Sequence, residues 1–100
     1  MELLEFGNSN RAGKKLKAIF IIDGKKKTYH FGSDVSKTYS EGADETKKEN
    51  YIKRHKVNEI WDKTNPASLS RLVLWGKYQN INKNLKLFLK RFKVKDMRDK

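Results

Sequence analysis

The C-terminal third of the chain places lysines at helical spacing along one side of a predicted helix. At about 100° per residue, the basic positions share one face and a set of apolar positions falls on the opposite face. The basic set is Lys83, Lys86, Lys90 and Lys93, with Arg91 at its flank. The apolar set is Ile81, Leu85, Phe88 and Phe92. Such a helix can bury one side in a core and present a row of positive charge, whose chemistry is the neutralisation of a polyanion.

Acidic residues are absent between Asn80 and Lys95, so no ion pair at i,i+4 spacing can offset the repulsion within this row. An unpaired basic row costs stability, which favours contact with an external anion. An ordinary solvated helix face is the alternative interpretation.

A second basic cluster, Lys25–Lys27, follows a predicted hairpin turn. Lysines at the tip of a hairpin can contact phosphates or enter a groove. Lysines on an exposed edge strand also prevent aggregation, and the sequence does not separate these two interpretations.

Basic residues also occur inside two predicted helices. Lys53 and Arg54 are candidate phosphate contacts, whereas Tyr51 and His55 lie one helical turn apart and are expected to pack inward. Arg71 lies in the most apolar helix and is expected to be partly buried, either paired with an acid or positioning a phosphate.

Neither catalysis nor metal binding is predicted. The chain has no cysteine, and its two histidines lack Asp or Glu at ligand spacing. No serine stands in a nucleophile elbow, and there is no phosphate-binding glycine loop. Glu59 and Asp62 are best explained as solvated or paired with lysines. We therefore expect no enzymatic activity, no cofactor and no metal.

A hairpin is expected after a flexible lead-in at residues 1–13. The apolar run 16–22 and the run 27–31 are joined by Asp23-Gly24, a pair typical of two-residue hairpin turns. This turn places Phe20 opposite Lys27. The expected core face carries Leu16, Ala18, Phe20, Tyr29 and Phe31, and the other face includes Ile19 and Ile21.

About three helices are expected to pack on this hairpin. Asp44 can cap a helix that runs to His55, and Asn65 before Pro66 can cap a helix over residues 67–75. The basic helix follows, and Trp61 and Trp75 are expected to anchor the core. The prediction is one small α+β domain over residues 14–95, with a frayed tail at 96–100.

The bulk composition agrees with a polyanion partner. The chain has 100 residues, 24 Lys and Arg against 12 Asp and Glu, and a net charge of +12. Ten basic and two acidic residues give positions 68–100 a charge of +8. No apolar run reaches the ~18 residues of a membrane span, so no integral membrane segment is expected. Nucleic acid is the first candidate partner.

Several short motifs follow one another along the chain in a characteristic order. They are Phe31-Gly32, Thr38-Tyr39, Tyr51-Ile52 with Arg54-His55, Glu59, Trp61, and Leu69-Ser70-Arg71 with Leu74-Trp75-Gly76. This order resembles a family of short proteins of nucleocytoplasmic large DNA viruses, known mainly as a domain of unknown function. The similarity spans roughly residues 16–92. Leu72 stands where many members have Trp, and Asn50 where they have a basic residue.

These features predict a non-enzymatic protein that binds nucleic acid through the phosphate backbone with little sequence selectivity. Double-stranded DNA is the expected partner, with RNA as an alternative and other virion proteins as further partners. The resemblance implies a viral protein located in the virion and in the infected-cell cytoplasm or nucleus. The alternative functions are a structural virion component that contacts acidic capsid or scaffold protein, and a peripheral binder of an anionic inner membrane. The oligomeric state is left open.

Overall fold

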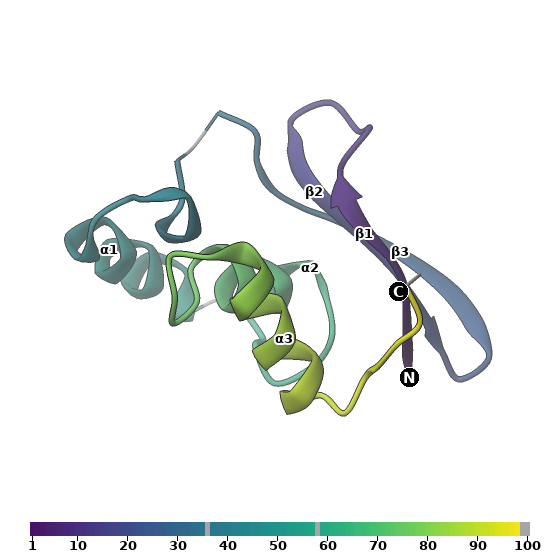
Figure 1. Cartoon of the computed structure of the whole chain (residues 1–100). Helices are drawn as coiled ribbons and strands as arrows, with labels where there is room; N and C mark the ends of the chain where they lie inside the picture. Colours follow the sequence, from purple (N-terminus) through teal and green to yellow (C-terminus); the bar gives the residue numbers. More distant parts are fainter. Residues whose placement is uncertain (36, 58, 99–100) are drawn as a thin grey trace.

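Four strands form one sheet, and the helices cover one of its faces (Figure 1). The computed structural model describes residues 1–35, 37–57 and 59–98. The strands are β1 (Glu2–Asn8), β2 (Lys14–Ile22), β3 (Lys25–Ser33) and β4 (Lys95–Asp96), in the spatial order β3-β2-β1-β4. The α+β class predicted from the sequence, with a hairpin against helices, is confirmed.

The β2–β3 hairpin has the predicted turn and register. Asp23 and Gly24 both adopt positive φ, at 52° and 77°, as a two-residue turn of this kind requires. Phe20 pairs with Lys27, and Leu16 pairs with Phe31. The apolar residues of both strands therefore reach the helical layer together.

The N-terminal residues depart from the expected flexible lead-in at 1–13. Glu2–Asn8 form β1, which pairs antiparallel with β2. A bulge between Leu3 and Glu5 shifts the register, so that Leu3 and Phe6 lie opposite Phe20 and Ala18 on the core side. Leu3 is fully buried, which explains why this segment is held in the sheet.

The C-terminal end also differs from the expected frayed tail at 96–100. Lys95 and Asp96 form β4, parallel to β1. The Lys95 amide donates to the carbonyl of Met1 at 3.0 Å, and the Met97 amide donates to that of Leu3 at 2.8 Å. Residues 99–100 lie outside the described part of the chain.

The predicted N-terminal caps at Asp44 and Asn65 are confirmed, and the structure adds a third cap at Asn80. Asp44 accepts from the Lys47 amide, Asn65 from the Ser68 amide and Asn80 from the Lys83 amide. The helices are α1 (Glu45–Lys56), α2 (Pro66–Leu69) and α3 (Ile81–Arg91), with a 3₁₀ turn η1 (Tyr39–Glu41) and a π-helical segment η2 (Ser70–Leu74).

The predicted helix over residues 67–75 changes its winding halfway. It begins as α2 and continues as η2, where the Trp75 amide donates to the Ser70 carbonyl five residues back. Gly76 follows, and a Cβ at that position would lie 2.1 Å from the Leu72 carbonyl oxygen. Only glycine therefore fits where η2 ends.

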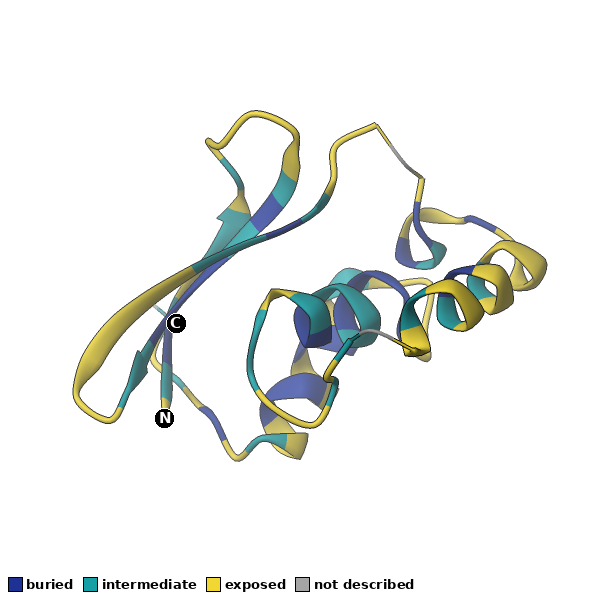
Figure 2. Ribbon diagram, turned by 180° about the vertical axis from the view of Figure 1, so that it is seen from behind, coloured by how far each residue is buried: buried dark blue, intermediate teal, exposed yellow. Residues whose placement is uncertain are grey.

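The core lies between the sheet and the helices, as the dark blue segments of Figure 2 show. Its fully buried members come from the sheet, from α2 and η2, and from α3. They include Leu3, Phe20, Phe31, Leu69, Val73, Leu74, Leu85 and Phe88. Trp75 is buried as expected, whereas Trp61 is only partly buried.

Ile19 lies outside the core cluster, on the predicted face, but it is more buried than an outward-facing position suggests. The sequence places it on the face away from the core, yet its side chain is only 6% exposed. Ile19 lies on β2, which is flanked on both sides, and its neighbours in register are Glu5 on β1 and Thr28 on β3. These neighbouring side chains shield Ile19 from water on that face.

Asn84 is a fully buried polar residue on the inner side of α3. Its side-chain amide donates to the carbonyls of Val73 and Tyr78 and to the hydroxyl of Ser40, at 2.7–2.9 Å. Its oxygen accepts from the Tyr78 amide at 2.9 Å. One side chain thus ties α3 to η1, to η2 and to the η2–α3 connection.

Candidate nucleic-acid interface

The predicted basic row is present on α3. Lys83, Lys86 and Lys90 are exposed, while Leu85 and Phe88 on the opposite side are buried. Within the described residues, none of these three ammonium groups makes an ion pair with a carboxylate. Lys83 lies 5.5 Å from the centre of the Tyr78 ring. The row is therefore a positive surface held in place by the core behind it.

Lys93 does not belong to this row, contrary to the prediction. The helix ends at Arg91, and Lys93 adopts a left-handed conformation with φ of 55°. The Val94 amide donates to the Leu89 carbonyl at 2.8 Å, which closes the helix end. The chain turns here so that Val94 enters the core and β4 can reach β1.

The hairpin lysines form a second, separate basic surface. Lys25, Lys26 and Lys27 are all exposed beside the β2–β3 turn. In Figure 1 this turn forms the lower right tip of the sheet, whereas the C-terminal end of α3 lies below the helices, nearer the middle of the molecule. Lys15, farther along the hairpin, pairs with Glu41 at 2.7 Å and serves the fold instead.

Lys53 and Arg54 lie on the outer side of α1 and are exposed. With Lys47 they line a shallow basic depression on that helix. Tyr51 is buried as expected, whereas His55 stacks on it with 37% of its side chain still exposed. The predicted contacts therefore fall on three surfaces: α3, the hairpin tip and the outer side of α1.

Six residues from the motifs of the chain form a closed ring of contacts. Glu59 accepts from the Trp61 indole and bonds the His55 ring at 2.6 Å. His55 stacks on Tyr51 with ring centres 4.2 Å apart, and Tyr51 stacks on Trp75 at 4.6 Å. The sixth member is Arg71, and its contacts close the ring.

Arg71 donates from Nη1 to the Trp75 carbonyl at 2.7 Å, and its guanidinium lies 5.4 Å from the Trp61 ring centre. The expected partial burial is confirmed, but its partner is a carbonyl and not an acid. Its Nε atom is buried without a hydrogen-bond partner in the described structure. Burial lowers the pKa of Arg71, and the nearby charge of Arg91 lowers it further.

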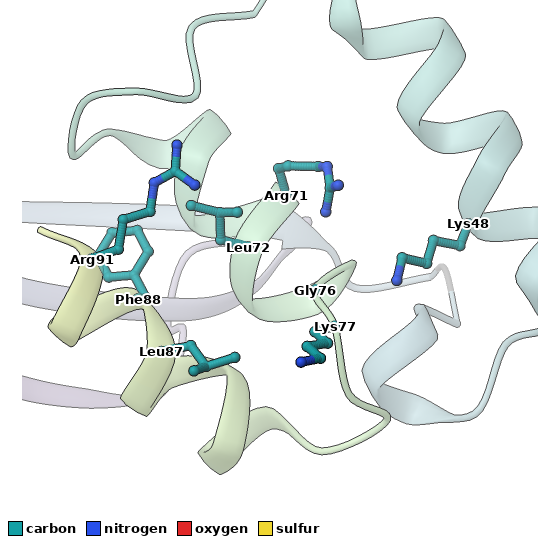
Figure 3. Close-up of a pocket in the computed structure, with 8 residues that line it drawn as sticks. All are labelled: Lys48, Arg71, Leu72, Gly76, Lys77, Leu87, Phe88 and Arg91. Carbon is teal, nitrogen blue, oxygen red and sulfur yellow. The ribbon is translucent and has the colours of Figure 1, made fainter.

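A cavity of about 490 Å³ opens beside Arg71, between α1, η2 and α3 (Figure 3). Its basic lining residues are Lys48, Arg71, Lys77 and Arg91, and none of the described residues that line it is acidic. Figure 3 shows Lys48 extending from α1 toward the segment that carries Gly76 and Lys77. The walls also include Leu72, Leu87 and Phe88.

Lys48 and Lys77 were not predicted as site residues. A signal existed for Lys48, because helical spacing places it on the same side of α1 as Tyr51 and Ile52, where a basic residue is unusual. For Lys77 there was none, because its place depends on how the η2–α3 connection folds.

Tyr51 makes the ring sensitive to alkaline pH. Burial, followed by the charge of Glu59, raises the pKa of Tyr51 to about 12. Because the unfolded phenol ionises near pH 10, stability is retained below pH 10 and is lost between pH 10 and pH 12. We expect this phenol to remove about 2–3 kcal/mol of the free energy of unfolding over that interval.

Urea unfolding of the wild type and of Tyr51→Phe at several pH values measures this loss. The Phe variant lacks the phenol, so its stability should fall less between pH 10 and pH 12. Parallel curves for the two proteins would contradict the assignment.

The fold and the site define a small α+β domain with an unpaired basic helix face and a basic cavity. Among known families, the chain belongs to a family of unknown function, DUF5754, whose model matches residues 4–55. No curated protein and no solved structure matches the chain. No helix within residues 1–35, 37–57 and 59–98 is long and apolar enough to cross a membrane.

Proposed function

We propose that this protein binds the phosphate backbone of nucleic acid and has no enzymatic activity. The observation that carries the proposal is the row of Lys83, Lys86 and Lys90 on α3, which lacks carboxylate partners within the described chain. The helix cannot turn this row away from solvent, because its opposite side is fixed in the core.

Binding would proceed by neutralisation of phosphates and release of their counterions. Arg91 lies at the flank of the row on α3, and the exposed lysines at the hairpin tip supply a second, separate contact. Lysine ammonium groups act as point charges without the two-pronged geometry that reads a base edge. Such contacts position a backbone without selecting a sequence.

Double-stranded DNA is the partner that we propose first. The motif resemblance adds a viral setting, in which the protein is packaged with the genome or organises it, in the virion and in the infected cell. Contact with an acidic capsid protein, or with an anionic membrane through the same face, would use the same charges, so the test must separate these partners.

A salt titration with duplex DNA, single-stranded DNA and RNA, run beside anionic liposomes, tests the proposal. With about five to seven phosphate contacts, log K should fall with log salt with a slope of roughly −4 to −6 on duplex DNA. A duplex affinity that does not depend on salt, or liposome binding stronger than duplex binding, would overturn the proposal.

A further inference from the structure

Four positive groups, one from each of four parts of the chain, line the cavity beside Arg71. Lys48 comes from α1, Arg71 from η2, Lys77 from the following connection and Arg91 from α3. Among the residues that the structure describes, none with a carboxylate lines the cavity. Like charges that line one cavity repel each other. Burial is the main cause of the lowered pKa of Arg71, and the charge of Arg91 lowers it further. An anion in the cavity would relieve that cost.

Arg71 is the fixed member of the group. Its Nη1 is held by the Trp75 carbonyl, and the ring of Trp61 lies against its guanidinium. The described residues offer it no carboxylate, and its Nε has no partner. Lys77 is exposed and Lys48 is half-buried, and each ammonium group lies near a tyrosine ring, that of Tyr78 or Tyr39. The site therefore combines one charge held by a hydrogen bond with charges on flexible lysine side chains.

The cavity is continuous with the basic row on α3. On the helix, Leu87 lies between Lys83 and Lys90 on one side and Arg91 on the other. Leu87 and Arg91 both line the cavity, and Leu87 is 43% exposed. A nucleic acid that follows the lysine row would thus meet the cavity at the edge of that row.

We propose that this cavity binds a phosphomonoester, either the phosphorylated end of a nucleic acid strand or a free nucleotide. The part of this inference that places the end of a nucleic acid strand in the cavity rests on the proposed function. A phosphodiester within a strand carries one negative charge and a sugar on each side. A terminal phosphate carries about −1.5 to −2 and only one substituent, which suits a walled cavity with four cations. Leu72 and Leu87 offer apolar surface to that substituent.

Paired oligonucleotides test the proposal. One sequence is prepared with a 5′-phosphate, with a 3′-phosphate and with hydroxyl ends, and adenosine monophosphate and inorganic phosphate serve as free probes. In the wild type, a terminal phosphate should increase affinity about tenfold over the hydroxyl form, as one or two charge-assisted hydrogen bonds allow. Adenosine monophosphate should shift the Arg71 Nε–H signal in NMR spectra.

Matched variants locate the effect. Lys48→Gln with Lys77→Gln should abolish the tenfold preference and change the affinity of the hydroxyl form by less than about twofold. The control variant, Lys47→Gln with Lys53→Gln, removes the same charge from α1, the helix that also carries Lys48. It should keep the preference for the terminal phosphate. Equal melting temperatures for both double variants would show that neither change acts through the fold.

The outcomes separate the two proposals. If the hydroxyl and phosphate forms bind equally and adenosine monophosphate shifts nothing, the cavity inference is overturned and the backbone proposal stands. If no oligonucleotide binds, the backbone proposal fails, while a nucleotide signal that is lost in the Lys48→Gln, Lys77→Gln variant still supports the cavity. A preference that survives this variant overturns the inference.

Discussion

Replacement of Asn84 by alanine should lower the free energy of unfolding by roughly 3–5 kcal/mol, because several buried polar groups lose their partner at once. The Asn84 side-chain NH2 group donates hydrogen bonds to two carbonyls and one hydroxyl, and the side-chain oxygen accepts one from the Tyr78 backbone amide. The site is fully buried, so water cannot replace these bonds without disturbing the core. Since the free energy of unfolding of a small domain is only about 5–15 kcal/mol, the variant should be close to unfolding.

Urea denaturation of Asn84→Ala and Asn82→Ala measures the effect. Asn82 lies on the same helix but is exposed, so its replacement should change stability by no more than about 0.5 kcal/mol. Similar midpoints for the two variants would mean that the buried network does not support the fold.

Conversion of Lys83, Lys86 and Lys90 to glutamine should reduce affinity for duplex DNA roughly 100-fold at low salt. Loss of three phosphate contacts should also make the slope of log K against log salt shallower by about 2.7. The helix should remain folded, because all three side chains are exposed and their mutual repulsion is removed. Fluorescence anisotropy at several salt concentrations provides both numbers.

A second triple variant controls for net charge. Lys37, Lys56 and Lys63 are also exposed, and none of them is a proposed contact. Their conversion to glutamine removes the same charge and should change the salt slope by less than one unit. Equal losses in the two triple variants would show that overall charge, and not the α3 row, governs binding.

The parts of the fold that the sequence predicts correctly depend on local chemistry. The Asp23-Gly24 turn determines the hairpin register, and Asp44 and Asn65 cap α1 and α2. Each of these signals acts over a few residues, so no knowledge of the rest of the molecule is needed. The inward packing of Tyr51 follows from helical spacing for the same reason.

The features that the sequence does not reveal depend on distant contacts. The bulge in β1 puts Leu3 and Phe6 on one side although they are three residues apart, which hides the two-residue period of a strand. The left-handed turn at Lys93 directs the chain away from the basic row because β1 accepts a parallel neighbour there. The cavity requires α1, η2 and α3 to meet, and only the folded chain brings them together.

The pairing of β4 with β1 has a consequence for how the domain is assembled. Glu2 lies beside Lys95, so this edge of the sheet closes the longest loop between paired strands. Chain entropy opposes such a closure more strongly than it opposes the tight β2–β3 connection. Distant pairings of this kind slow folding. We therefore expect the hairpin to be an early event and the joining of the two chain ends to be a late one.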